Sequence, residues 1–284
     1  MKTLLVLIDG LCAEALQHTD TPNIDKIIQT GAFSLQCQTV FPPVTLPAHV
    51  SLFTSLDPEQ HGIHDNSPPP QSLALTFFDL ASRKNLKTAF FYTWENLRIL
   101  SRTGSLDHSC FMKKCKTTIG DHLIMEKAIE YIHAETPDFA FIYLGCTDEA
   151  GHKEGFMSLS YFQQIERADH AIGQLLHFLE ESCLDDEYTC LLTSDHGGHG
   201  HKHDGSVPVD FVIPWMIMGP SIRKNHIIES PVSILDTVPT LARIMRLPAL
   251  DFWQGEVKEE IFSKPKWINF GEPKQIAMEQ SFAI

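Results

Sequence analysis

Three apolar runs of the sequence each lead into an aspartate. They are TLLVLIDG at Asp9, FAFIYLGCTDEAGH at Asp148 and YTCLLTSDHGG at Asp195. A single aspartate after a strand usually belongs to a turn. Three of them, two with histidines at short spacing, favour a shared metal site instead. Mixed aspartate and histidine ligands suit zinc, and manganese less strongly.

Histidines accompany two of these aspartates. Asp148 and His152 are four residues apart, a spacing that brings both side chains to one side of a helical segment. Asp195 is followed directly by His196. The glycine-rich loop that comes next contains His199, His201 and His203. For His199 and His201 the pattern favours a solvated turn.

A threonine with nucleophilic potential lies in the stretch FPPVTLPAHVSLFTSLDPEQHGIHDN, from Phe41 to Asn66. Prolines surround Thr45, and the apolar run after it has the spacing of a buried helix. The N-terminus of a helix favours an anion, so the Thr45 hydroxyl could attack a phosphate held there. The alternative is that Thr45 serves only as the helix N-cap.

Strands and helices that alternate along the chain must position these residues. Strands are expected at 3–8, 34–39, 87–94, 139–145, 188–193 and 212–218, and helices at 22–30, 48–56, 73–85, 121–134, 158–181 and 233–245. This order predicts an α/β fold with a largely parallel central sheet and helices on both faces. In such a sheet the site lies beyond the carboxyl ends of the strands, where the three aspartates would converge.

The chain is expected to form a single domain, 1–284, because 284 residues with 43% hydrophobic content can bury one large core. Residues 67–71 (SPPPQ) predict a loop. Residues 94–120 show the least regular pattern and are interpreted as a small insertion or cap.

The composition of the chain limits the classes of partner and the cellular location that we expect. With 36 acidic and 22 basic residues, the net charge of −14 argues against a nucleic-acid polymer or an anionic membrane as the main partner. Seven cysteines without a CxxC pair argue against a disulfide framework or a thiolate zinc site, and favour the cytoplasm. The run LLVLI before Asp9 is too short for a signal peptide, and no stretch approaches the length of a membrane span.

Several motifs occur together in an order that resembles the alkaline phosphatase superfamily. They are DG after the first strand, TPNIDKI, TLPAHVSLFTSLDPEQHGIHDN, DEAGH, and SDHGG followed by a further histidine. The resemblance runs from Asp9 to about Trp215 and is closest to the type I phosphodiesterase and nucleotide pyrophosphatase branch. The segment SILDTVPTLARIM at 233–245 also resembles the C-terminal helix of that family.

The resemblance implies an alkaline phosphatase-like fold and a hydrolase that cleaves phosphodiesters or nucleotide pyrophosphates through a phosphothreonine intermediate. Thr45 matches the nucleophile, and Asn66 matches the asparagine that donates to a phosphoryl oxygen. The backbone N–H after Thr45 would be a further donor to the phosphate.

Two divalent metal ions, zinc or alternatively manganese, are implied as cofactors. The matching ligands are Asp9, Asp195 and His196 for the metal that touches Thr45, and Asp148, His152 and His203 for the other. Around His203 the sequence departs from the family, because Asp204 stands where a glycine commonly follows. His199 or His201 is the alternative ligand.

Other activities on the same fold remain as alternatives: a phosphomonoesterase, a phosphonate hydrolase, a sulfatase, or a metal-binding module without catalysis. A sulfatase ranks low because its nucleophile is made from Cys or Ser in a C/S-x-P-x-R setting. Here the stretch reads T-L-P-A-H, and threonine cannot become formylglycine.

The expected substrate is a small-molecule phosphoester, with diesters preferred over monoesters. A monoester carries a second negative charge, which usually requires an arginine near the phosphate, and the motif stretches contain none. The nearest cations in sequence are Lys153, Lys202, Arg98 and Arg102. Trp94, at the end of the aromatic run FFYTW, could stack on a base. The sequence leaves the oligomeric state open.

Overall fold

The computed structural model describes residues 1–67, 74–113 and 119–263. Most of the predicted loop at 67–71 and part of the predicted insertion at 94–120 lie outside these ranges, as does Cys115. The six cysteines within them carry free thiols. Of the helices in this part of the chain, none combines the length and apolar character that crossing a membrane requires.

One mixed sheet forms the centre of the molecule. Its strands are β1 Lys2–Ile8, β2 Ala32–Gln38, β3 Thr88–Tyr92, β4 His108–Phe111, β5 Phe139–Leu144, β6 Tyr188–Thr193, β7 Val212–Met218 and β8 His226–Ile227. The helices are α1 Pro22–Thr30, α2 Thr45–Thr54, α3 Pro58–His61, α4 Phe77–Arg83, α5 Gly120–Glu135, α6 Cys146–Glu154, α7 Leu159–Glu181 and α8 Thr237–Met245. Short 3-10 helices occupy Ala13–Gln17, Glu95–Leu100, Pro208–Asp210, Ile234–Asp236 and Glu259–Ile261.

The strand order is β4-β3-β5-β1-β6-β7-β2-β8. Strands β4, β3, β5, β1 and β6 run parallel to one another, and β7 is antiparallel to both β6 and β2. The predicted α/β fold with a largely parallel sheet is therefore confirmed. Because β1 has β5 on one side and β6 on the other, the ends of these three strands lie next to each other.

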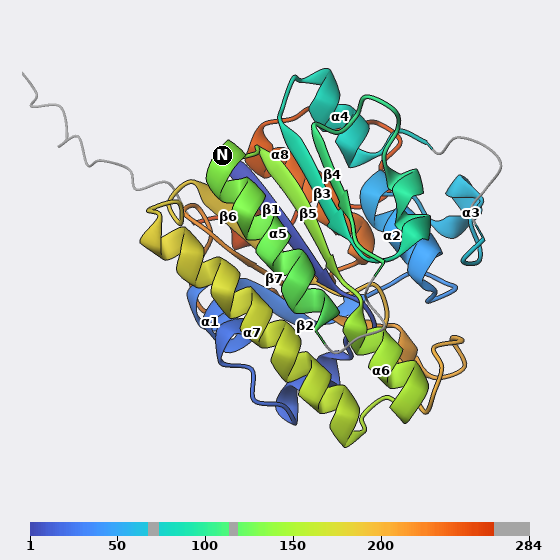
Figure 1. Cartoon of the computed structure of the whole chain (residues 1–284). Coiled ribbons are helices and arrows are strands. Elements are labelled where there is room, and N and C mark those ends of the chain that lie inside the picture. Colours follow the sequence, from blue (N-terminus) through green and yellow to red (C-terminus); the bar gives the residue numbers. More distant parts are fainter. Residues whose placement is uncertain (68–73, 114–118, 264–284) are drawn as a thin grey trace, which may run out of the picture.

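Helices cover both faces of the sheet (Figure 1). Helices α1, α5 and α7 pack on one face, and α2, α4 and α8 pack on the other. Side chains alternate along a strand, so β1 sends Leu5 and Leu7 to the second face and Leu4, Val6 and Ile8 to the first. This two-sided burial explains why the β1 sequence is continuously apolar.

The region predicted as an insertion contributes to the main sheet. His108–Phe111 form β4, which pairs in parallel with β3 at one edge of the sheet. The sequence did not predict this strand, because β4 has four residues and none of them is fully buried. Such an edge strand shows neither the alternation nor the apolar run that identifies a strand in sequence.

Candidate active site

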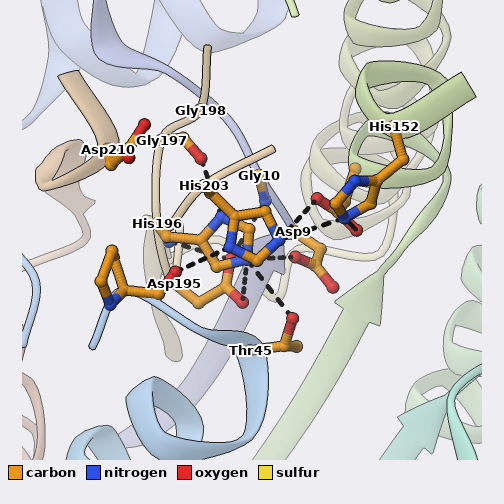
Figure 2. Close-up of polar contacts among 12 residues, drawn as sticks. Asp9, Gly10, Thr45, His152, Asp195, His196, Gly197, Gly198, His203 and Asp210 are labelled. Carbon is orange, nitrogen blue, oxygen red and sulfur yellow. Dashed lines mark hydrogen bonds and ion pairs between the residues drawn. The ribbon is translucent and has the colours of Figure 1, made fainter. Parts of the chain in front are cut away.

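The three aspartates meet at the carboxyl ends of neighbouring strands, and Figure 2 shows Asp9 and Asp195 there. Asp9 follows β1, and Asp195 lies two residues after β6. Asp148 is in the first turn of α6, which begins two residues after β5. The site therefore follows from the order β5-β1-β6, which places the ends of these strands at one edge.

The first ligand group joins Asp9, Asp195 and His196. Nε2 of His196 lies 3.3 Å from Asp9 Oδ1 and 3.4 Å from Asp195 Oδ2. Its Nδ1 lies 2.8 Å from the Gly197 carbonyl, which only accepts, so in the neutral ring Nε2 presents a lone pair. Both carboxylate oxygens are buried without a hydrogen-bond partner among the described residues. A cation would satisfy all three atoms.

The second ligand group joins Asp148, His152 and His203. The Nε2 atoms of the two histidines face each other at 3.1 Å. Each ring also places Nδ1 against a backbone carbonyl, His201 O at 2.9 Å and Pro43 O at 2.7 Å. Two lone pairs at this distance repel each other unless a cation lies between them. Asp148 Oδ1, buried and without a hydrogen-bond partner in the described part of the chain, lies 3.8 Å from His203 Nε2.

The electrostatics of the site favour bound positive charge. Burial raises the pKa of Asp9, and the charges of Asp195 and Asp148 raise it further. Burial also raises the pKa of Asp148. For His203, burial and then the neighbouring His196 lower the pKa to about 3. The protein alone therefore penalises the ionised carboxylates of Asp9 and Asp148, and divalent cations would relieve that penalty.

Backbone geometry at Gly10 helps to bring the carboxylates together. Its N–H donates to Asp195 Oδ1 over 3.1 Å. The residue has φ of 67°, and a Cβ added there would lie 2.9 Å from Asp148 Oδ1. Only glycine combines this left-handed conformation with so close an approach.

Thr45 is the first residue of α2, and Val44 is the N-cap. The hydroxyl Oγ1 of Thr45 lies 3.3 Å from His196 Nε2 and is buried with the first ligand group (Figure 2). Pro47 fits in the first helical turn, where its missing N–H needs no partner. Because Val44 is the N-cap, Thr45 does not cap the helix, and its hydroxyl faces the first ligand group.

Asn66 lies beside the start of α2. Its Oδ1 accepts a hydrogen bond from the Leu46 N–H over 2.9 Å, and its carbonyl accepts one from Asn96 Nδ2 over 2.7 Å. The Leu46 N–H, predicted as a phosphate donor, thus donates to Asn66 in this structure. The amide Nδ2 of Asn66 remains as the donor on that side.

We expect Asn66→Ala to lower kcat about a hundredfold, because one preorganised donor to a developing negative charge contributes roughly 3 kcal/mol. Steady-state kinetics on an activated diester measures the change. Asn96→Ala is the matched control, since it removes only the support of the Asn66 carbonyl. An Asn66→Ala loss no larger than that of Asn96→Ala would contradict a role at the phosphate.

His201 lies outside both ligand groups, and His199 forms a separate group of possible metal ligands with Asp204 and Asp210. His199 Nδ1 is 2.7 Å from Asp210 Oδ1, and His201 Nδ1 is 3.0 Å from the His152 carbonyl. Among the three loop histidines, the structure brings only His203 together with Asp148 and His152. His201 instead supports His152 through reciprocal contacts of ring and backbone.

Sequence reasoning missed Tyr143, whose hydroxyl donates to Asp9 Oδ2. This residue lies in β5, next to β1. Its only signal in the sequence is one hydroxyl in an otherwise apolar strand. By occupying Oδ2, Tyr143 leaves Asp9 Oδ1 facing His196.

A cavity of about 580 Å³ opens beside Thr45 and Asn66. Its wall includes Trp94, Phe111, Lys113 and Glu149. Trp94 thus lies where the sequence predicted, whereas Phe90 and Phe91 are fully buried in the core. Phe111 and Lys113 come from the end of β4 and the residues after it.

The four basic residues that lie nearest to the motifs in sequence do not line this cavity. Each pairs with a carboxylate: Lys153 with Glu154, Lys202 with Asp204, Arg98 with Glu95 and Arg102 with Asp79. Among the described residues, Lys113 is the cation at the cavity wall. The sequence did not reveal it, because β4 was not predicted.

The chain matches the family described as type I phosphodiesterase / nucleotide pyrophosphatase over residues 3–103 and 86–218. A venom phosphodiesterase of Naja atra is 29% identical over 217 residues, which cover 68% of this chain and 26% of the relative. Ectonucleotide pyrophosphatase/phosphodiesterase family member 1 of Rattus norvegicus is 28% identical over 216 residues, which cover 69% of this chain and 24% of that relative. The chain thus spans about a quarter of the length of these relatives.

Solved structures share the fold. Human ectonucleotide pyrophosphatase/phosphodiesterase 5 superposes with a TM-score of 0.79 at 17% identity, covering 93% of this chain and 100% of that one. A phosphonate monoester hydrolase from Silicibacter pomeroyi superposes with a TM-score of 0.74 at 13% identity, covering 94% of this chain and 78% of that one. Together with the motif order and the family match over residues 3–218, these findings show that the chain belongs to the type I phosphodiesterase/nucleotide pyrophosphatase family, with an alkaline phosphatase-like fold.

Proposed function

We propose that this protein is a two-metal-dependent hydrolase that cleaves phosphodiester or nucleotide pyrophosphate bonds through a phosphothreonine intermediate. Family membership supports the reaction class. One observation carries the mechanism: Thr45 Oγ1 lies 3.3 Å from Nε2 of His196, within a buried group of metal-type ligands. A hydroxyl in that place is suited to act as a nucleophile.

The residues fit two divalent cations. Three buried carboxylate oxygens without hydrogen-bond partners in the described residues point into the site, and two imidazole nitrogens face each other. The proposed ligands are Asp9, Asp195 and His196 for one cation and Asp148, His152 and His203 for the other. The proposed metal is zinc, with manganese as the alternative, because of the mixed ligand set.

When bound, the cations would supply positive charge that favours ionisation of the Thr45 hydroxyl and balances the phosphoryl group. Oγ1 of Thr45 then bonds to phosphorus while the bond from phosphorus to the leaving oxygen breaks. This produces phosphothreonine and releases the leaving group. In the second half, a water oxygen bonds to phosphorus while the bond from phosphorus to Oγ1 breaks. Oγ1 takes up a proton that the water gives up, which restores Thr45, and the phosphoryl product leaves.

The cavity beside Thr45 is proposed to hold the organic group of a small phosphoester substrate. Trp94 and Phe111 give it an aromatic wall suited to a flat group such as a base. Asn66 Nδ2 would donate to a phosphoryl oxygen.

The cytoplasmic location indicated by the cysteine pattern remains a prediction.

Comparing kcat/KM for a nitrophenyl diester, a nucleoside nitrophenyl diester and a nitrophenyl monoester tests the substrate class. We expect the diesters to be cleaved better, because no arginine in the described residues lines the cavity. The aromatic wall should make the nucleoside diester the best of the three. Trp94→Ala should reduce that advantage about tenfold, the value of one stacking contact.

A monoester preference would contradict the diesterase proposal and favour the phosphomonoesterase alternative. Lys113 would then be the cation that accepts the additional charge. In that case Lys113→Ala should lower monoester turnover more than diester turnover. Lys153→Ala is the matched control, because Lys153 pairs with Glu154 away from the cavity. No turnover of any ester would favour a metal-binding module without catalysis.

A further inference from the structure

His49 lies one helical turn after Thr45 on α2 and is completely buried. It belongs to neither ligand group and does not line the cavity. Its ring meets the Tyr143 ring edge-on, with 5.4 Å between the centroids. Tyr143 in turn donates a hydrogen bond to Asp9, so the imidazole of His49 is connected through Tyr143 to the first ligand group.

One nitrogen of His49 lies close both to the backbone of Thr45 and to a proposed ligand carboxylate. Nδ1 lies 2.7 Å from the Thr45 carbonyl oxygen, which only accepts, so Nδ1 carries the hydrogen. The same nitrogen lies 3.5 Å from Asp195 Oδ2, one of the two carboxylate oxygens that face His196. This is too long for a second strong hydrogen bond, yet the N–H dipole is close to the carboxylate.

The other ring nitrogen argues against a purely packing role. Nε2 of His49 is buried with no hydrogen-bond partner among the described residues. An unpartnered polar atom in the interior is destabilising, so an apolar side chain of similar size would suit packing alone better. The Nδ1 hydrogen is therefore the feature that distinguishes histidine at this position.

We propose that His49 is a positioning residue that sets the Thr45 hydroxyl relative to the Asp195 ligand. Through one N–H group it holds the first turn of α2 against the carboxylate that faces His196. It touches neither the reacting atoms nor the cations. The inference rests on the proposed function, since it assumes that Thr45 and Asp195 act together.

Replacing His49 by asparagine and by leucine separates the N–H group from the bulk. The amide N–H₂ of asparagine can take the place of imidazole Nδ1, whereas leucine keeps an apolar side chain without a donor. For His49→Leu we expect weaker binding of one of the two ions, with Kd raised about ten- to a hundredfold. We also expect kcat to fall more than KM changes. His49→Asn should recover most of both losses.

Thr54→Val is the matched control. Thr54 Oγ1 donates to the Val50 carbonyl over 2.7 Å, which is the same four-residue contact at the far end of α2. This variant should lower Tm while metal affinity and kcat stay unchanged. If His49→Leu does not fold, His49→Gln replaces it, because its amide is one methylene farther from the backbone and should fail where asparagine succeeds.

Chelator competition measures the two affinities, and thermal unfolding measures Tm. The inference is overturned if His49→Leu loses only Tm, as Thr54→Val does, or if asparagine performs no better than leucine or glutamine. The affinity measurement also separates this inference from the proposed function. A wild-type protein that binds two ions but hydrolyses no phosphoester would contradict the proposed function, and the affinities of the variants would still decide the role of His49.

Discussion

Thr45→Ala is expected to reduce turnover roughly 10⁴-fold or more, because it removes the attacking oxygen. Metal content and fold should be retained, because the Thr45 side chain is small and mainly nucleophilic, Asp9, Asp195 and His196 remain as ligands, and Val44 forms the N-cap. The loss of stability should be about 1 kcal/mol or less, as for many small truncations. Steady-state kinetics, elemental analysis and thermal unfolding measure the three quantities.

Thr45→Ser is the matched control, because it keeps a hydroxyl at the N-terminus of α2 and should keep measurable turnover. Mass spectrometry after acid quenching should find one added phosphoryl group on wild-type protein and on the serine variant, but not on the alanine variant. An alanine variant that keeps most of its activity would show that water attacks phosphorus directly. The two ligand groups would remain as described.

Metal removal is expected to abolish turnover, and reconstitution should restore it with two ions per chain. This expectation rests on the buried carboxylate oxygens that have no hydrogen-bond partner in the described part of the chain, and on the 3.1 Å separation between the Nε2 atoms of His152 and His203. His203→Ala should lower the stoichiometry to one ion. It should also reduce kcat by at least about a hundredfold, because one source of charge stabilisation is lost.

His199→Ala is the control for the loop, since His199 contacts Asp210 and belongs to a separate cluster with Asp204 and Asp210, outside the two proposed ligand groups. It should keep two ions and near-normal turnover. If no more than one ion binds to wild-type protein with either zinc or manganese, the two-metal proposal is wrong. If two ions bind and His203→Ala leaves both affinities unchanged, only the assignment of His203 fails.

Local physical rules allowed much of the fold to be read from the sequence. Continuous apolar runs marked β1, β5 and β6 because these strands are buried on both faces. Their alternation with amphipathic helices indicated a parallel sheet, and the aspartates at their ends marked the edge where a site forms. The structure confirms the fold class, and the family match confirms the resemblance.

Tertiary structure decided the features that depend on distant contacts. The short edge strand β4 forms by pairing with β3, so no local sequence pattern predicted it. For the same reason the sequence did not predict that Lys113 lies at the cavity. Glycines in the loop after Asp195 allow many paths, and spacing alone could not select His203 from its neighbours. Its ring is directed by the Pro43 carbonyl, 160 positions away in sequence.

The sequence did not reveal the contacts of His49 and Tyr143 for the same reason. In sequence, His49 and Tyr143 look like core residues, because burial pattern reports which face a side chain takes and not which atom it contacts. The fold brings Tyr143 against Asp9, and His49 between the Thr45 carbonyl and Asp195. The sequence by itself indicated the candidate ligands and nucleophile, and it predicted that they share one edge of the sheet. Only the folded chain determined which atoms face one another, because hydrogen-bond directions depend on contacts between strands and helices far apart in sequence.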